Sequence, residues 1–166
     1  MQKLILSVED NPDDVLILKR AFQKANTSAH LEFLADGDQA IEYLAKMSQK
    51  PCPSLLLLDL KLPRKSGLEV LTWMRTQPAL KRLPVVMLTS SNQPEEINSA
   101  YDLGANSYLV KPSNMDDFVQ LAKAVEAYWV QTNTGPGPLG WDRNSQHSTL
   151  NVQRSSSDEQ SGAEAH

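Results

Sequence analysis

Short apolar runs alternate with longer amphipathic stretches between residues 4 and 130. Five runs predict strands, over residues 4–8, 31–35, 55–59, 83–91 and 106–110. The stretches that follow them have apolar residues at helical spacing and predict helices, over residues 13–25, 36–47, 66–76, 94–104 and 115–130. Because four leucines in LLLLD leave no polar face, we expect this strand to be covered on both sides. Successive strand–helix units of this kind predict an α/β fold with a parallel sheet between two layers of helices.

Composition narrows the class of protein. The chain has 166 residues, of which 40% are hydrophobic, enough for one domain with a core. A net charge of −4 argues against binding to DNA, which needs clustered Lys and Arg. Cys52 is the single cysteine, so no internal disulfide or cysteine zinc site is expected. The apolar start of the chain is too short for a signal peptide or a membrane span, and we predict a soluble, cytoplasmic protein with no membrane contact.

The composition changes after Gln131. The remaining residues are rich in Gly, Pro, Ser and Asn and poor in apolar side chains. We therefore predict a folded domain over residues 1–131 and a disordered polar tail over residues 132–166. The tail is too short and too polar for a DNA-binding output domain, so any output is expected to pass through protein contacts.

Polar side chains end or directly follow four of the predicted strands. They are Glu9 and Asp10, then Asp59, then Thr89 with Ser90 and Ser91, and finally Lys111. The carboxyl ends of parallel strands meet at one edge of the sheet, where ligands bind in open α/β folds. Three carboxylates held close together repel one another and recruit a cation, and oxygen ligands without His or Cys suit Mg²⁺. A hydroxyl and an ammonium beside Asp59 suit phosphoryl transfer to that carboxylate.

These motifs resemble the receiver domain of two-component response regulators, of the chemotaxis CheY type, over residues 3 to about 130. The matching motifs are Glu9-Asp10, DLKLPRKSG from Asp59 to Gly67, LTSS with Thr89, and SYLVKP with Tyr108, Lys111 and Pro112. The resemblance implies a flavodoxin-like, doubly wound five-stranded sheet of order 2-1-3-4-5 with five helices. EDNPDD and the first helix are also similar to the small regulators that partner bacterial phytochrome kinases.

The resemblance implies a role for each residue. Asp59 would accept the phosphoryl group, and Mg²⁺, or Mn²⁺ in its place, would be held by Asp59, Asp10, Glu9 through water, and the backbone carbonyl of Lys61. Thr89, Ser90 and Lys111 would contact the phosphoryl group, and Tyr108 would turn inward. The Lys111–Pro112 peptide bond would be cis. Two interaction surfaces are also expected. A kinase-docking surface on the first helix would contain Val15, Leu16, Lys19 and Phe22. A homodimer surface on the last helices would contain Ile97, Tyr101, Val125 and Trp129.

We expect a stand-alone response regulator and not an enzyme. A histidine kinase would phosphorylate it, and phosphorylation would switch a surface built from helix four, strand five and helix five. Several alternatives stay open. Glu9 and Asp10 could merely cap a helix, and Thr89 could be an ordinary strand residue. The alternative function is a degenerate receiver that acts without phosphorylation. An Asp-nucleophile phosphohydrolase ranks lower because Lys61 stands where such an enzyme carries a second acid. A flavodoxin-like cofactor binder also ranks lower, because the acidic EDNPDD loop repels phosphate.

Overall fold

Residues 2–136 are described by a computed structural model and form one parallel sheet between two layers of helices. The strands lie in the order β2-β1-β3-β4-β5. Their bounds are Leu4–Val8 (β1), His30–Leu34 (β2), Leu55–Leu58 (β3), Val85–Thr89 (β4) and Ser107–Val110 (β5). The helices are Pro12–Lys24 (α1), Gly37–Ala45 (α2), Gly67–Thr76 (α3), Pro94–Asp102 (α4) and Met115–Val125 (α5), with a short 3-10 turn at Met47–Gln49 (η1) and a π-helical segment at Glu126–Thr132 (η2). This architecture confirms the predicted fold class.

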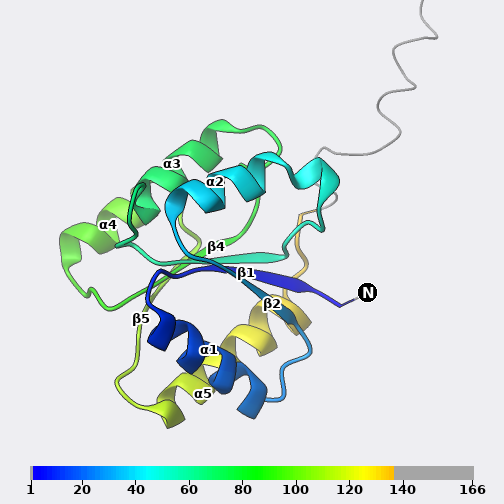
Figure 1. Cartoon of the computed structure of the whole chain (residues 1–166), viewed down its shortest axis with the longest axis vertical. Helices are drawn as coiled ribbons and strands as arrows, with labels where there is room; N and C mark the ends of the chain where they lie inside the picture. Colours follow the sequence, from blue (N-terminus) through cyan, green and yellow to red (C-terminus); the bar gives the residue numbers. More distant parts are fainter. Residues whose placement is uncertain (1, 137–166) are drawn as a thin grey trace, which may run out of the picture.

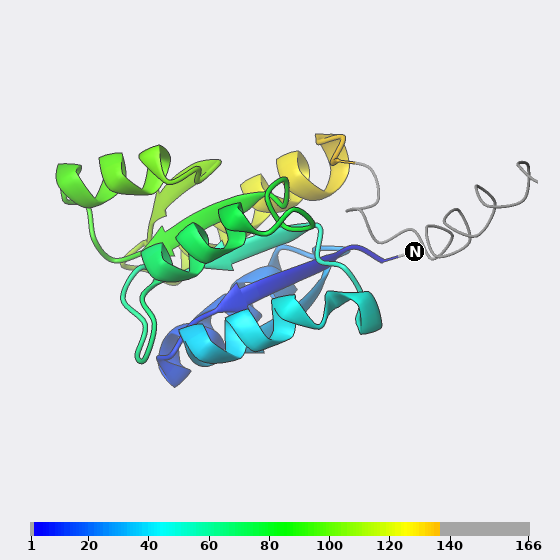
Figure 2. The same cartoon turned by 90° about the horizontal axis from the view of Figure 1, so that it is seen from above.

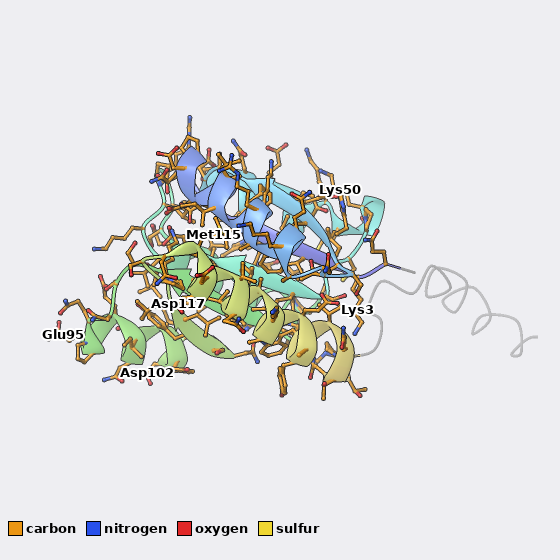
Figure 3. All side chains as sticks on the ribbon, turned by 90° about the horizontal axis from the view of Figure 1, so that it is seen from below. Lys3, Lys50, Glu95, Asp102, Met115 and Asp117 are labelled. Carbon is orange, nitrogen blue, oxygen red and sulfur yellow. The ribbon has the colours of Figure 1, made fainter. Side chains whose placement is uncertain are left out.

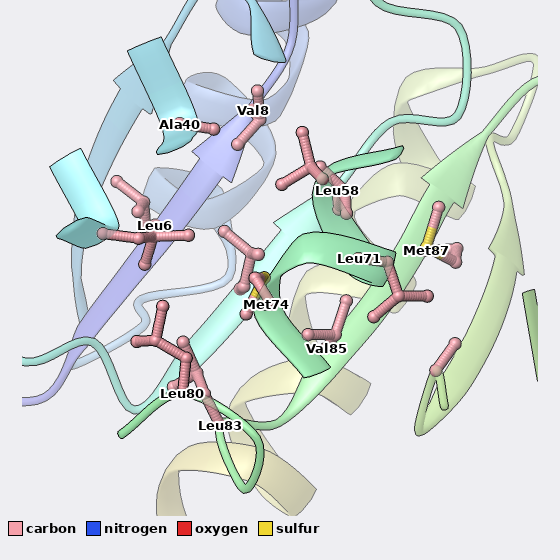
Figure 4. Close-up of a cluster of buried hydrophobic side chains, with 14 of the residues drawn as sticks. Leu6, Val8, Ala40, Leu58, Leu71, Met74, Leu80, Leu83, Val85 and Met87 are labelled. Carbon is pink, nitrogen blue, oxygen red and sulfur yellow. The ribbon is translucent and has the colours of Figure 1, made fainter. Parts of the chain in front are cut away.

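The two helical layers cover opposite faces of the sheet. Helices α2, α3 and α4 lie on one face, and α1 and α5 lie on the other (Figure 1). The run of leucines in β3 serves both layers, because successive side chains of a strand point to opposite faces. Leu56 and Leu58 belong to the cluster under α2 and α3, drawn in Figure 4, while Leu55 and Leu57 belong to the cluster under α1 and α5. All four are at most 1% exposed, as expected for a central strand.

Local signals in the sequence explain where the helices begin. The Asn11 side chain accepts a hydrogen bond of 2.9 Å from the amide of Asp13, and Pro12 occupies the first helical position of α1. Ser66 and Glu69 form a reciprocal capping box at the start of α3. These caps fix the points at which the β1–α1 and β3–α3 loops end. Both loops lie at the carboxyl edge of the sheet.

The end of α5 differs from the prediction of one continuous helix to residue 130. The α-helix ends at Val125 and continues as the π-helical segment η2. Buried Glu126 accepts hydrogen bonds from the amide and hydroxyl of Ser28, which tie this point of the chain to the α1–β2 loop. The apolar spacing in the sequence continues through the change, so it could not reveal it. Lys3 donates a bond of 2.5 Å to the carbonyl of Val130, and Figure 2 shows the start of the chain and η2 at the same end of the molecule.

The Lys111–Pro112 peptide bond is trans, as are the other peptide bonds of the part of the chain that the structure describes. The prediction of a cis bond is therefore wrong. Bonds before proline favour trans by about 0.5–1 kcal/mol, and the Lys111 ammonium reaches the carboxylates of the site with the trans bond. Residues 137–166, which make up most of the predicted disordered tail, lie outside the described residues. Within residues 2–136 no helix is long and apolar enough to cross a bilayer.

Candidate functional site

A polar pocket of about 410 Å³ opens at the carboxyl edge of the sheet. Its walls come from the loops that follow β1, β3, β4 and β5 and from the first turn of α1. The lining includes the residues proposed from the sequence, namely Glu9, Asp10, Asp59, Lys61, Thr89, Ser90, Ser91 and Lys111. It also includes residues that the sequence did not single out, namely Asn11, Asp14, Asn92 and Gln93. The topology therefore brings the candidate residues of four separate loops into one place.

Three carboxylates form a compact group in this pocket. One oxygen from each of Glu9, Asp10 and Asp59 lies within 4.8 Å of the others. Glu9 and Asp59 are buried, whereas Asp10 is exposed. The backbone fixes the two buried residues, because the amide of Glu9 bonds to Leu34 on β2 and the amide of Asp59 bonds to Val8 on β1. These carboxylates are thus positioned by the sheet and not by flexible loops.

Gly67 allows the β3–α3 loop to fold back over Asp59. A Cβ atom at this position would lie 2.1 Å from the backbone oxygen of Asp59, far inside van der Waals contact. The amide of Gly67 also donates a 2.9 Å bond to the carbonyl of Leu60. The glycine in DLKLPRKSG is therefore required by a close approach of two backbone segments next to the site.

The Lys111 ammonium lies between carboxylates of the pocket. It donates to Asp59 at 3.0 Å, to Asp14 at 2.8 Å and to Glu9 in a close contact. The Lys111 side chain is only 7% exposed. The contact of Asp14 with Lys111 was missed from the sequence, because Asp14 follows no strand directly and lies in the first turn of α1.

Burial and neighbouring charges shift the pKa values of Glu9 and Lys111. Burial raises the pKa of Glu9 to about 7, and the Asp59 charge adds to this, while Lys111 and the Asn11 amide oppose it. Burial alone would lower the pKa of Lys111, but its bonds to Asp14, Glu9 and Asp59 outweigh burial and raise it. Three carboxylates share the Lys111 ammonium and Asp10 adds a fourth carboxylate nearby, so negative charge is in excess. An all-oxygen donor set with excess negative charge fits a hard divalent cation.

Thr89 and Tyr108 are joined through Ser91. Thr89 is 2% exposed, and its hydroxyl lies 3.5 Å from the amide of Ser91. The Tyr108 hydroxyl donates a 3.0 Å bond to the carbonyl of Ser91, and burial raises the pKa of this tyrosine. The Ser91 hydroxyl in turn donates to the carboxylate of Glu96 on α4. The half-buried tyrosine is therefore already tied to the β4–α4 loop, through a serine and a glutamate whose part in this link the sequence did not reveal.

The Lys61 side chain is exposed, and the ion pair of Glu9 is with Lys111. The amide of Lys61 lies 3.4 Å from a carboxylate oxygen of Asp59, a long hydrogen bond. Ser90 is exposed at the end of β4 and lines the pocket. Lys61 therefore contacts Asp59 through its backbone amide.

Two residues assigned to surfaces from the sequence lie in the core instead. Phe22 is 2% exposed, and so is Val125, and both pack in the cluster between the sheet, α1 and α5. They cannot contribute to a docking or dimer surface. Leu16, at 46% exposed, and Tyr101, at 49%, do lie on the surface as expected. Spacing along a helix identified an apolar face but could not separate its buried from its exposed edge.

Comparisons with known proteins agree with this geometry. The family model for the response regulator receiver domain matches residues 5–123. The response regulator Rcp1 of Synechocystis sp. is 36% identical over 137 residues, which are 81% of this chain and 93% of Rcp1. A probable methanogenesis regulatory protein, FilR2 of Methanothrix harundinacea, is also 36% identical, over 81% of this chain and 88% of its own length.

Solved structures give the same result. The Mn²⁺-bound form of Rcp1 superposes with a TM-score of 0.73 at 36% identity, covering 81% of this chain and 99% of Rcp1. The phosphorylated cyanobacterial phytochrome response regulator RcpA superposes with a TM-score of 0.76 at 36% identity, covering 82% and 99%. The order of the strands, the acidic group at their carboxyl ends and these matches lead to one conclusion: the chain belongs to the response regulator receiver domain family of two-component signalling.

Proposed function

We propose that this receiver is a phosphorylation switch in which Asp59 accepts a phosphoryl group from a histidine kinase. The observation that carries the proposal is the meeting of Glu9, Asp10 and Asp59 within 4.8 Å, with the Lys111 ammonium 3.0 Å from Asp59. A carboxylate that only caps a helix does not need to be buried. Glu9 and Asp59 are buried, with 3% and 7% of the whole residue exposed. Groups this costly to bury are typical of functional sites.

The proposed reaction is transfer from a phosphohistidine to a carboxylate. An Asp59 oxygen forms the bond to phosphorus while the phosphorus–nitrogen bond of the donor breaks, and the imidazole leaves with that electron pair and takes up a proton from solvent. Lys111 would bind a phosphoryl oxygen, and Thr89 and Ser90 line the same pocket as hydroxyl donors. Mg²⁺, or Mn²⁺ in its place, bound by Asp59, Asp10, Glu9 and the Lys61 carbonyl, would neutralise the charge on the phosphoryl oxygens.

The Thr89–Ser91–Tyr108 link would carry the signal to the surface. A new bond from the Thr89 hydroxyl to the phosphoryl group would displace the β4–α4 loop, which holds the Tyr108 hydroxyl through Ser91. The same loop is joined to α4 through Glu96. The surface formed by α4, β5 and α5 would therefore exist in two arrangements whose populations phosphorylation shifts.

Partners follow from the relatives and from the surface. RcpA is a phytochrome response regulator, so we propose a phytochrome-type histidine kinase as the phosphoryl donor of this chain. The output would be a contact with another protein, and the α4–β5–α5 face would also support a homodimer. Tyr101 and Val110 are 49% and 44% exposed there, and Figure 3 shows Glu95 and Asp102 of α4 at the outside of the molecule. A monomeric mass in light scattering, both with and without phosphorylation, would rule the dimer out.

Turnover of an external substrate is not proposed. A hydrolase with an aspartate nucleophile needs a second acid for proton transfer. The corresponding residue here is Lys61, whose side chain is exposed. We therefore propose a switch that is phosphorylated and slowly loses its own phosphoryl group, and not an enzyme.

Incubation with acetyl phosphate tests the proposed function directly. Wild type, Asp59→Asn and the control Asp38→Asn, which replaces an exposed aspartate of α2, would be compared by intact mass with Mg²⁺ and with EDTA. We expect one phosphoryl group on wild type and on the control only with Mg²⁺, and none on Asp59→Asn. If wild type stays unlabelled by acetyl phosphate and by phosphorylated histidine kinases, the domain is a receiver that acts without phosphorylation.

A further inference from the structure

The three hydrogen-bond donors of the Lys111 ammonium face three carboxylates from three different elements. Glu9 follows β1, Asp59 follows β3, and Asp14 lies in the first turn of α1. A lysine ammonium has three N–H donors and no more. All of them are therefore in use before any phosphoryl group arrives. A phosphoryl oxygen on Asp59 can bind Lys111 only if one of these carboxylates gives up its place.

Asp14 differs from the other two carboxylates in its position. Glu9 and Asp59 belong to the compact group with Asp10 that suits a divalent cation, and Asp14 is outside that group. Asp14 is also the most exposed of the three, with 26% of its side chain accessible against 2% for Glu9 and 9% for Asp59. A cation in the group would draw the oxygens of Glu9 and Asp59 away from Lys111. Asp14 is then the carboxylate left to hold the ammonium.

The first turn of α1 suits Asp14 to this task. The helix is capped by Asn11 and begins with Pro12, so the backbone that carries Asp14 has a defined helical conformation. The positive end of the helix dipole stabilises a negative charge at this position. A cation and an ammonium in one small pocket repel each other, and a fixed carboxylate beside the ammonium offsets that repulsion.

We propose that Asp14 is a positioning residue that keeps the Lys111 ammonium beside Asp59 while a divalent cation and the phosphoryl group occupy the site. The proposal rests on the proposed function, because it assigns a step of phosphorylation to this residue. Asp14 acts through Lys111 and does not touch the phosphoryl group. Its loss would leave the long lysine side chain free to turn toward solvent, so that fewer encounters with a phosphoryl donor find it in place.

The test compares Asp14→Asn with Asp13→Asn. Both changes remove one negative charge from the first turn of α1, but the Asp13 side chain is exposed and is not among the partners of the Lys111 ammonium. Phosphorylation by acetyl phosphate would be followed at saturating Mg²⁺. We expect Asp14→Asn to slow phosphorylation roughly tenfold, the size of effect that loss of one hydrogen bond between charged groups produces. Asp13→Asn is expected to change the rate less than about twofold, because exposed charges act weakly.

A second comparison shows whether Asp14 acts through Lys111. Asp14→Asn would be combined with Lys111→Ala, and the rates of the single and double variants compared. We expect Asp14→Asn to have almost no further effect once Lys111 is absent. The proposal would be overturned if Asp14→Asn slowed phosphorylation equally with and without Lys111, or if Asp14→Asn and Asp13→Asn had equal effects. Either result would mean that Asp14 acts only through its charge and not through Lys111.

NMR of the lysine ammonium groups tests the contact without phosphorylation. The signal of Lys111, assigned by its loss in Lys111→Ala, would be recorded in ¹⁵N-labelled protein with Mg²⁺. We expect Asp14→Asn to shift this signal and speed its exchange with water, and Asp13→Asn to leave it unchanged. An unchanged signal in Asp14→Asn would overturn the proposal. Failure of wild type to be labelled by acetyl phosphate or kinases would instead count against the proposed function, and the NMR result would still decide whether Asp14 holds Lys111.

Discussion

Replacing Lys111 by methionine is expected to destabilise the domain strongly, because the change leaves three carboxylates without their shared cation. The side chains of Glu9 and Asp59 are 2% and 9% exposed, and that of Asp14 is 26% exposed. Breaking a buried ion pair by removing one partner costs about 3–5 kcal/mol. The partial exposure of Asp14 and the freedom of Glu9 to take up a proton lower the expected cost. We expect a loss of about 3 kcal/mol in the free energy of unfolding near pH 8.

The loss depends on pH through Glu9. Its pKa is raised from 4.5 to about 7 in the wild-type fold, and removal of Lys111, which opposes this rise, would raise it further. A carboxyl group whose folded pKa lies above its unfolded value binds protons more tightly in the folded state. Its stabilising protonation is present at low pH and is lost as the pH rises toward the folded pKa. The difference in stability between Lys111→Met and wild type should therefore shrink near pH 5 and be largest near pH 8.

Urea unfolding followed by circular dichroism in EDTA, at about pH 5 and about pH 8, measures this difference. The control is Lys81→Met, which removes an exposed lysine from the α3–β4 loop. Added Mg²⁺ should stabilise Lys111→Met more than wild type, because the cation takes over part of the neutralisation. A difference of less than about 0.5 kcal/mol between Lys111→Met and wild type near pH 8, or the same difference at both pH values, would refute this reasoning.

Three further changes have defined outcomes. Gly67→Ala would place a Cβ atom 2.1 Å from the Asp59 carbonyl oxygen and so force the β3–α3 loop away from it. We expect a loss of about 1–3 kcal/mol in the free energy of unfolding, measured with heat or urea, and slower phosphorylation. Leu57→Ala, at a residue 1% exposed, should cost about 3 kcal/mol in urea unfolding by opening a cavity. Burial opposes ionisation of Glu126, but bonds from Ser28 and Gln131 outweigh it and lower the pKa. Its stabilising charge is present above pH 4.5 and is lost as the pH falls through the lowered pKa, so Glu126→Gln should flatten the loss of stability in acid.

Matched changes at exposed positions serve as controls for these three. Gly135→Ala meets no atom within 4 Å and should leave stability unchanged. Leu16→Ala, at a side chain 46% exposed, should change it by less than about 0.5 kcal/mol. Glu95→Gln removes an exposed carboxylate of α4 and should leave the acid profile as in wild type. Equal effects of a change and its control would contradict the burial argument behind that prediction.

Most of the fold could be predicted from the order of apolar runs and caps. The five strands lie within a few residues of their predicted bounds, because a run such as LLLLD has no alternative to burial on both faces. The change to a π-helix at Glu126 could not be predicted, because the apolar spacing continues through it and the contact of Glu126 with Ser28 joins residues far apart in the sequence. The conformation of the Lys111–Pro112 bond was predicted wrongly, because the resemblance and not a local signal in the residues had implied it.

The sequence by itself determined which side chains end the strands, and parallel topology then brings Glu9, Asp10 and Asp59 to one edge. Only the tertiary structure decided how these groups share their partners. It brought the Asp14 carboxylate into contact with the Lys111 ammonium, and it connected Tyr108 to Thr89 through Ser91. Strand ends follow from local patterns of burial, which a sequence displays directly. Contacts between loops depend on distances of a few ångströms set by the packing of the whole sheet and its helices, and no local pattern in the chain records them.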